Sequence, residues 1–310
     1  MKVLITGANG FVGSGLVSAF RRAGYETVCA VRTPSDGCVA VGDIDDTTDW
    51  TDTLAGCDAV VHAAARVHQM QENSAEAAAL YHRTNVLGTE HLAREAARAG
   101  VKRFVFLSSI KAMGEGGFFS REMPCLPEDD YGRSKRDAEV VLSRVAAETG
   151  LEIVILRLPL IYGPGVRANF LKLFDLVSRG VPLPLGAVNN ARSLLALGNL
   201  TDLVIVCVGN ANAVGNIYLP SDSAPVSTAG MLRSIAAVLG KPSRLIAVPP
   251  AIIRLGASLL GRKAAADRVL GDLQVDSSPL QEELGWTPPL SFEEALRETA
   301  AWYLTRSRSQ

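Results

Sequence analysis

The sequence predicts an α/β protein: a doubly wound parallel sheet followed by a smaller, mostly helical C-terminal lobe. In the first half, short apolar runs alternate with segments of helical spacing. Continuous apolar strands separated by helices indicate a parallel sheet that helices cover on both faces. After Gly165, prolines cluster in several short segments and helical patterns dominate. We therefore predict one domain over residues 1–165 and a second over 166–310, with about 192–220 packing partly back on the first.

Each predicted element of the first domain has its own local signal. Helices are expected where apolar residues recur with a period near 3.6, and three such segments end at a glycine, which suits a helix C-cap. The predicted strands are residues 2–6, 26–32, 58–64, 102–109 and 151–159, and the predicted helices are residues 10–24, 85–100 and about 131–150.

Two longer apolar segments, residues 194–209 and 249–261, are predicted to be buried helices. The first contains Asp202 and the second contains Arg254. Both fall short of the roughly 18 to 20 apolar residues that are needed to span a bilayer. No membrane insertion is therefore expected.

The composition excludes several classes of protein. Apolar residues make up 48% of the 310 residues, which suits a large core rather than a disordered chain. A net charge of −1 without a basic run argues against a nucleic-acid surface or a polybasic membrane contact. Five scattered cysteines without a Cys-x-x-Cys pair fit a reducing cytoplasm and predict neither disulfides nor a metal site. Glycine interrupts the N-terminus too early for a signal peptide, so a cytoplasmic protein is expected.

A glycine loop joins the first predicted strand to the first predicted helix. It has the pattern T-G-x-x-G-x-x-G. Glycines let the backbone approach a pyrophosphate, and the following helix offers its N-terminal N–H groups and the positive end of its dipole. The loop therefore predicts a dinucleotide site that includes Gly7, Asn9, Gly10, Phe11, Val12 and Gly13.

The end of the second strand bears on which dinucleotide binds. An NAD site usually presents an acid there to the ribose 2′-hydroxyl. Here the strand ends in Arg32, which suits a 2′-phosphate, so NADP(H) is favoured and NAD(H) is left open. Asp43 is expected to meet the adenine amine, and His62 is expected to be structural. Further cofactor contacts are assigned to Ile44, Ala63, Ala64, Ala65 and Pro159.

A tyrosine and a lysine lie four residues apart in the predicted helix that begins near residue 131. Side chains at this spacing point to the same face of a helix, so Tyr131 and Lys135 are neighbours. The spacing alone is weak, because a half-buried tyrosine and a solvated lysine also produce it.

Motifs along the whole chain give this pair a role. In order, they are TGANGFVG, GDIDD, VVHAAA, NVLGT, FVFLSSIKAMGE, YGRSK, RLPLIYGPG and LGWTPPLSFEEAL. With them the chain resembles the extended short-chain dehydrogenases/reductases, in the nucleotide-sugar epimerase, dehydratase and reductase branch. The resemblance implies a Rossmann domain, a catalytic pair of Tyr131 and Lys135 that also contacts the cofactor, a catalytic hydroxyl on Ser109, and a structural Asn85. A tyrosine with a pKa of about 10 needs a nearby ammonium to act as a base near neutral pH, which Lys135 supplies.

The residues after Ser109 distinguish the branches of this family. The resemblance implies that a 4,6-dehydratase carries an Asp-Glu pair there, where this chain has Ile110 and Lys111. A lysine does not replace a carboxylate that must shuttle a proton, so a dehydratase is rejected. Lys111 also departs from the epimerase pattern, and it is predicted to contact substrate.

The resemblance also implies substrate contacts in the second lobe. Asn169 matches the family's contact with the sugar-nucleotide diphosphate, and Leu185 lies in a segment like the one beside the uracil. Arg192 is retained in a stretch whose acids are replaced here, and it would clamp phosphate, as would Arg268.

Together these features predict an NAD(P)-dependent oxidoreductase that acts at C4 of a UDP-sugar. The preferred prediction is a UDP-4-keto-6-deoxy-N-acetylhexosamine 4-reductase of surface-polysaccharide synthesis. The alternative is a 4-epimerase of the UDP-glucose or UDP-GlcNAc type with bound NAD. A reductase of a small ketone and a non-catalytic dinucleotide sensor are disfavoured. A homodimer is expected, because the helices near Asn85 and Tyr131 carry small and apolar residues on more than one face.

Overall fold

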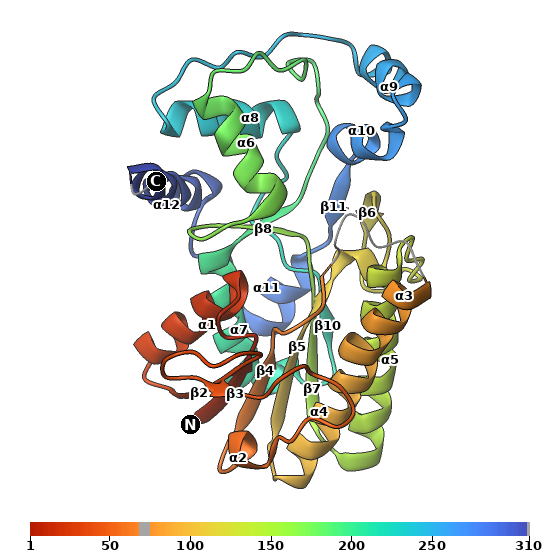
Figure 1. Cartoon of the computed structure of the whole chain (residues 1–310), viewed down its shortest axis with the longest axis vertical. Helices are drawn as coiled ribbons and strands as arrows, with labels where there is room; N and C mark the ends of the chain where they lie inside the picture. Colours follow the sequence, from red (N-terminus) through yellow and green to blue (C-terminus); the bar gives the residue numbers. More distant parts are fainter. Residues whose placement is uncertain (68–74, 309–310) are drawn as a thin grey trace.

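A seven-stranded parallel sheet forms the centre of the larger lobe (Figure 1). The computed structural model describes residues 1–67 and 75–308. The strand order is β10-β7-β5-β4-β1-β2-β3, and every neighbouring pair is parallel. This confirms the predicted doubly wound sheet. The strands are β1 Lys2–Thr6, β2 Glu26–Val31, β3 Val39–Ala40, β4 Ala59–His62, β5 Arg103–Ser109, β7 Glu152–Leu158 and β10 Ile217–Tyr218.

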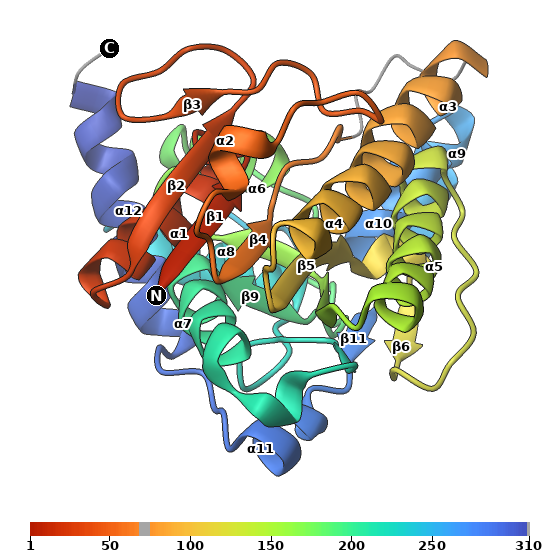
Figure 2. The same cartoon turned by 90° about the horizontal axis from the view of Figure 1, so that it is seen from below.

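Helices cover both faces of this sheet (Figure 2). One face packs against α1 (Phe11–Arg22) and α7 (Leu197–Gly209), and the other against α4 (Gly88–Arg98) and α5 (Asp130–Thr149). The central strands β1, β4, β5 and β7 are largely apolar and buried along almost their whole length because both of their faces are covered, as their sequences predicted, whereas both residues of the edge strand β3 are exposed. Shorter elements on this lobe are α2 Thr51–Leu54, α3 Ala75–Tyr81, the π-helical turn η1 His82–Leu87, and the 3₁₀ turns η2 Ile110–Ala112 and η3 Ala211–Ala213.

The C-terminal half of the chain supplies part of the core beneath the sheet. Leu200 and Leu203 of α7 lie in the same cluster as Ile5 and Val105 of the sheet. Residues from α11 (Ser278–Leu284) and the segment after it join this cluster through Leu280 and Trp286. The strand β10 completes the edge of the sheet beside β7.

The second lobe is mostly helical. Its core lies between α6 (Ala168–Ser178), α8 (Thr228–Val238) and α12 (Phe292–Arg308) and contains a row of aromatic rings. Neighbouring rings in the row have centroids 5.2 to 5.9 Å apart, and they belong to Tyr162, Phe170, Phe174 and Tyr303. Two small parallel ribbons also form, β8 Leu160–Tyr162 with β9 Leu194–Ala196, and β6 Gly117–Phe119 with β11 Leu273–Val275.

One of the two apolar segments is not buried as predicted. Residues 194–209 form β9 and α7 and are largely buried, but residues 249–261 form α9 (Pro250–Leu259), which has no fully buried residue. Helix α9 lies with α10 (Lys263–Leu270) at the far end of the second lobe (Figure 1). Hydropathy alone did not distinguish the two segments, because both contain apolar residues at helical spacing.

None of the helices in residues 1–67 and 75–308 combines the length and apolar character required to cross a membrane.

Candidate active site

The glycine loop is shaped so that only glycine fits at two of its positions. Gly7 has φ +66°, and a Cβ atom there would lie 2.9 Å from Cα of Ala64. A Cβ atom at Gly13 would lie 2.0 Å from the carbonyl oxygen of Gly7. In the described chain no side chain caps α1, so its first N–H groups are available to an anion. The loop therefore fits the pyrophosphate of a dinucleotide.

A buried histidine ties the glycine loop to the end of β4. The Oγ1 atom of Thr6 accepts hydrogen bonds from the backbone N–H groups of Ala63 (3.2 Å) and Ala64 (3.1 Å). The ring of His62 lies between Thr6 Oγ1 at 2.7 Å and Thr89 Oγ1 at 3.1 Å. Burial lowers the pKa of His62 to about 3, and the charge on Lys135 acts in the same direction. His62 is thus a neutral, structural side chain.

An ion pair lies after β2, where the sequence predicted contacts with the adenosine part of a cofactor. Arg32, after β2, lies 3.0 Å from an Oδ1 oxygen of Asp43, and both side chains are exposed. The guanidinium that the sequence assigned to a 2′-phosphate therefore already has a carboxylate beside it. Ile44 packs so closely on α4 that a Cβ atom at Gly88 would lie 2.8 Å from it. Of the other assigned contacts, Asn9 is exposed, Phe11, Val12, Ala63, Ala64 and Ala65 are half-buried, and Pro159 is buried after β7.

The predicted catalytic residues meet where β5 ends and α5 begins. Ser109 is the last residue of β5, and Tyr131 lies in the first turn of α5. This turn is capped by Asp129, whose Oδ1 accepts from the N–H of Gly132 at 2.7 Å. A Cβ atom at Gly132 would lie 2.3 Å from the carbonyl oxygen of Lys111, so glycine lets α5 approach η2. Burial raises the pKa of Tyr131 to about 12, although its hydrogen bond with the Ser109 side chain acts in the opposite direction.

Lys135 lies one turn further along α5 and is buried beneath the tyrosine. Its Nζ donates to the carbonyl oxygen of Leu107 at 2.8 Å and lies 4.4 Å from the centroid of the Phe106 ring. Burial lowers the pKa of Lys135 to about 7, and the carboxylate of Glu139 partly offsets this. Near neutral pH the ammonium is therefore poised between its charged and neutral forms.

An asparagine in the π-helical turn η1 holds α5 against the segment after β4. Asn85 Nδ2 donates to Ser134 Oγ at 2.9 Å and to the carbonyl oxygen of Arg66 at 3.0 Å. Its Oδ1 accepts from the N–H of Arg66 at 2.8 Å. The side chain is buried. It supports the helix that carries Tyr131, which is a structural role.

A buried ion pair beneath Lys135 was missed by sequence reasoning. Glu139, four residues after Lys135, accepts two hydrogen bonds at 3.1 and 2.7 Å from Arg157 of β7 through one carboxylate oxygen. Its other oxygen accepts from the hydroxyl of Ser108. Tyr131, Lys135 and Glu139 recur every four residues on one face of α5, and that spacing was the available signal.

The ammonium of Lys111 is held between two acids. Its Nζ lies 2.8 Å from Glu115 and 2.6 Å from Asp129. Burial lowers the pKa of Lys111, but these two hydrogen-bonded carboxylates outweigh it and the pKa is raised. Glu115 also pairs with Arg268 of α10 at 2.7 Å. Ion pairs thus connect Lys111 in η2, through Glu115, with Arg268 in the second lobe. The substrate contact assigned to Lys111 stays a prediction.

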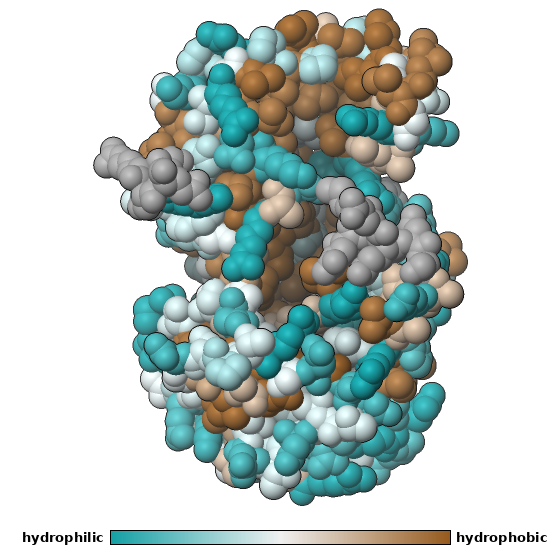
Figure 3. All heavy atoms as spheres, viewed as in Figure 1, coloured by the Kyte–Doolittle hydropathy of each residue, from teal (hydrophilic) through white to brown (hydrophobic). Residues whose placement is uncertain are grey.

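The two arginines predicted to clamp phosphate lie together. Arg192 Nη1 donates to the carbonyl oxygens of Arg268 (2.8 Å) and Gly271 (3.0 Å). Burial lowers the pKa of Arg192. Asn169 is exposed in the first turn of α6, and Leu185 is half-buried against the core of the second lobe. The space-filling view shows the molecule hollowed between the two lobes (Figure 3). The contacts of these four residues with substrate stay predictions.

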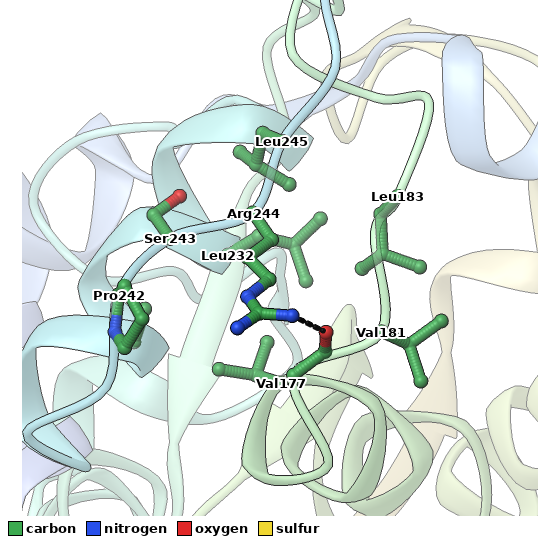
Figure 4. Close-up of a pocket in the computed structure, with 10 residues that line it drawn as sticks. Val177, Val181, Leu183, Leu232, Pro242, Ser243, Arg244 and Leu245 are labelled. Carbon is green, nitrogen blue, oxygen red and sulfur yellow. Dashed lines mark hydrogen bonds between the residues drawn. The ribbon is translucent and has the colours of Figure 1, made fainter.

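A small hollow in the second lobe lies apart from these residues. Apolar side chains of α6, α8 and the segments after them line it, and the Arg244 guanidinium donates to the carbonyl oxygen of Gly180 at 3.3 Å across it (Figure 4). None of the predicted site residues lines it.

A glycine loop on a doubly wound sheet, with a serine at the end of β5 and a tyrosine and a lysine at the start of α5, is typical of an oxidoreductase of the extended short-chain dehydrogenase/reductase type. The sequence agrees with this class in detail. A family model described as the NAD dependent epimerase/dehydratase family matches residues 3–218, and the chain belongs to this family.

Relatives and solved structures extend the comparison over the whole chain. A UDP-glucose 4-epimerase of Vibrio cholerae is 43% identical over 312 residues, which cover 97% of this chain and 95% of the relative. The structure is similar to a UDP-glucuronic acid 4-epimerase from Bacillus cereus in complex with NAD, with a TM-score of 0.80 at 20% identity and 99% of each chain covered. It is also similar to a UDP-glucose 4-epimerase of Thermotoga maritima with UDP-glucose, with a TM-score of 0.80 at 21% identity, covering 99% of this chain and 100% of the other. These structural likenesses establish the fold.

Proposed function

We propose that the protein is a 4-epimerase of UDP-hexoses that works with bound NAD. The observation that carries this proposal is the 43% identity with a UDP-glucose 4-epimerase over nearly the full length of both chains. The arrangement of Ser109, Tyr131 and Lys135 supports it, since each is present at the expected element. The alternative that the sequence left open thus has better support than the 4-reductase it preferred.

The three polar side chains divide the work at the sugar's C4 oxygen. Tyr131 takes the proton of the 4-hydroxyl group and later returns it, while Ser109 donates a hydrogen bond that fixes the reacting oxygen. Lys135 lies one turn behind the phenol and, in its charged form, favours the phenolate. NAD held by the glycine loop would supply reversible hydride transfer at C4 of the sugar.

Arginines of the second lobe would hold the diphosphate of the nucleotide sugar. The Arg192 guanidinium donates to the backbone carbonyl oxygen of Arg268, so the two residues are neighbours, and guanidinium groups suit bidentate contacts with phosphate. Arg268 must exchange its partner Glu115 for the phosphate when substrate binds. Asn169 and Leu185 are proposed to contact the diphosphate and the uracil.

We propose NAD rather than NADP as the cofactor. The predicted preference for NADP depended on a free Arg32, but Asp43 lies 3.0 Å from its Nε. That carboxylate repels a 2′-phosphate and leaves the site better suited to a ribose hydroxyl. The family to which the chain belongs is described as NAD dependent.

The 4-reductase is the second candidate. Two observations fit a 4-reductase. The acid pair of a dehydratase is absent after Ser109, and the cation of Lys111 is expected to lie near the oxygen that reacts. Its support is weaker because Lys111 is already neutralised by Glu115 and Asp129.

Incubation with UDP-galactose and no added cofactor tests the proposal. Product is followed by NMR of the anomeric protons, and steady conversion to UDP-glucose is expected from the protein as purified. The Tyr131→Phe variant is the control and should convert little. If the protein fails to interconvert UDP-hexoses but oxidises NAD(P)H stoichiometrically with a UDP-4-keto-6-deoxy-N-acetylhexosamine, the 4-reductase is correct and the proposal is wrong.

A further inference from the structure

The helix α9 turns its apolar face toward solvent. Ile252, Leu255 and Leu259 lie on one side of the helix and are 59%, 63% and 81% exposed. Leu260, directly after the helix, is 76% exposed. A surface helix of a globular protein normally packs such a face against the core and leaves its polar face outside. In the space-filling view this apolar surface lies at the outer corner of the second lobe (Figure 3).

The chain around α9 is strongly basic although the whole protein is not. Residues 241–269 contain a single acid, Asp267, which pairs with Arg254 at 3.4 Å. The same stretch contains six cations in a chain with a net charge of −1: Lys241, Arg244, Arg254, Arg262, Lys263 and Arg268, of which Arg268 pairs with Glu115 at 2.7 Å. Two of them, Arg262 and Lys263, follow the apolar face directly, are exposed, and form no ion pair with the described residues.

We propose that this end of the second lobe docks on an anionic lipid bilayer. The surface consists of Ile252, Leu255, Leu259 and Leu260 with the cations Arg262 and Lys263, and we call it the α9 ridge. Apolar side chains on one face of an interfacial helix enter the boundary between headgroups and acyl chains, and neighbouring cations pair with lipid phosphates. This is peripheral binding in the plane of the surface, so it requires no spanning segment.

The shape of the ridge favours a bilayer over a protein partner. A stable protein interface buries about 800 Å² on each partner. The apolar part of the ridge lies on and directly after one helix of ten residues at the extremity of the lobe, so the area that it offers to a partner is small (Figure 1). A bilayer conforms to such a ridge. The excess of positive charge on it also matches a surface of anionic headgroups.

Flotation with lipid vesicles tests this proposal. The full-length protein is mixed with vesicles of phosphatidylcholine and phosphatidylglycerol at 3:1, or of phosphatidylcholine alone, and the bound fraction is measured. Binding is expected only to the anionic vesicles and should weaken at 0.5 M salt, where charges are screened over about 4 Å. Thermal unfolding measured in the absence of lipid is the check that each variant is folded, and this check does not depend on which sugar is the substrate.

Variants separate the two parts of the ridge. Leu255→Gln with Leu259→Gln is expected to lower the vesicle partition coefficient by about tenfold or more, because two apolar side chains no longer enter the bilayer. Arg262→Gln with Lys263→Gln is expected to lower it by about 20- to 30-fold, at about fivefold for each cation. The matched control is Leu126→Gln with Leu304→Gln, which changes two leucines elsewhere that are 69% and 44% exposed.

Three outcomes would overturn the proposal. The first is that wild-type protein does not float with anionic vesicles. The second is that the control pair lowers binding as much as the α9 pair, which would indicate nonspecific adsorption. The third is a fall in molar mass by light scattering on Leu255→Gln with Leu259→Gln, which would show that the α9 ridge covers a second copy of the chain.

Discussion

Replacing Lys135 with methionine should stabilise the cofactor-free protein at acid pH and destabilise it at alkaline pH. Methionine keeps an unbranched chain of similar length but carries no charge. Lys135 is buried, and burial lowers its pKa from 10.5 to about 7. Below pH 7 the folded wild-type protein must therefore hold a buried ammonium, whereas the unfolded chain solvates it freely.

The sign and size of the stability change follow from the pKa of Lys135 in the unfolded chain, 10.5, and in the folded protein, about 7. Between about pH 7 and 10.5 the unfolded chain binds a proton that the folded protein does not, so the free energy of unfolding rises with pH in this window. A shift from 10.5 to about 7 corresponds to about 5 kcal/mol. Methionine also leaves the carbonyl oxygen of Leu107 without its 2.8 Å hydrogen bond, which costs about 1–3 kcal/mol. Lys135→Met should thus be more stable by about 2–4 kcal/mol at pH 6 and less stable by about 1–3 kcal/mol at pH 10.5.

Urea denaturation of cofactor-stripped protein across pH 6 to 10.5 measures the difference. The same measurement on Lys102→Met, which removes an exposed lysine, corrects for the changed charge of the unfolded chain. A stability difference between wild type and Lys135→Met that stays constant over this range would refute the reasoning, because it would show that burial does not penalise the ammonium.

Three other substitutions and one mass measurement have expected outcomes. Tyr131→Phe should lower kcat by about 10² to 10⁴-fold with little change in cofactor affinity by fluorescence titration, and near-normal turnover would exclude Tyr131 as the proton carrier. Arg32→Asp should weaken NADPH binding further and leave NADH binding similar, whereas a strong wild-type preference for NADPH in kcat/KM would contradict the assigned role of Asp43. Glu139→Gln should cost about 3–5 kcal/mol in thermal unfolding because Arg157 is then buried without a counter-charge, and an unchanged Tm would show that the pair carries no such penalty. Light scattering at micromolar concentration should give a homodimer formed through α4 and α5, and a monomer mass would disprove it.

The features predicted well from the sequence are those that a short segment specifies by itself. Gly13 was predictable because it is forced by contacts with Gly7 and Ala8 inside one βα unit, and Gly7 was predictable because it belongs to the same loop motif, although the atoms it must avoid include Ala64 after β4. Tyr131 and Lys135 were assigned because their spacing within one helix recurs in a family motif. The parallel sheet was predicted because its strands are continuous apolar runs. Strands that are buried on both faces do not alternate apolar and polar residues.

The features that were missed depend on partners far away in the sequence. Arg32 was expected to meet a 2′-phosphate and Asp43 the adenine amine, and the ion pair between them was not predicted because the two residues follow different strands. The ion pairs from Asp129 through Lys111 and Glu115 to Arg268 join residues up to 153 positions apart. The predicted burial of α9 was wrong, because a hydropathy pattern shows that a helix has an apolar face but does not show whether another element covers that face.

The return of α7, β10 and α11 to the sheet has a consequence for how the protein is made and engineered. Leu203, Leu280 and Trp286 all pack into the core beneath β1 and β5, although they follow the glycine loop by some two hundred residues or more. A ribosome must therefore release nearly the whole chain before this face of the dinucleotide-binding domain can close. Chimeras that exchange the substrate lobe at residue 165 would remove α7 and α11 from that face and leave α1 as its only cover among the helices that the structure describes in the first half, so exchanges should retain residues 194–218 and 278–286 with the first half.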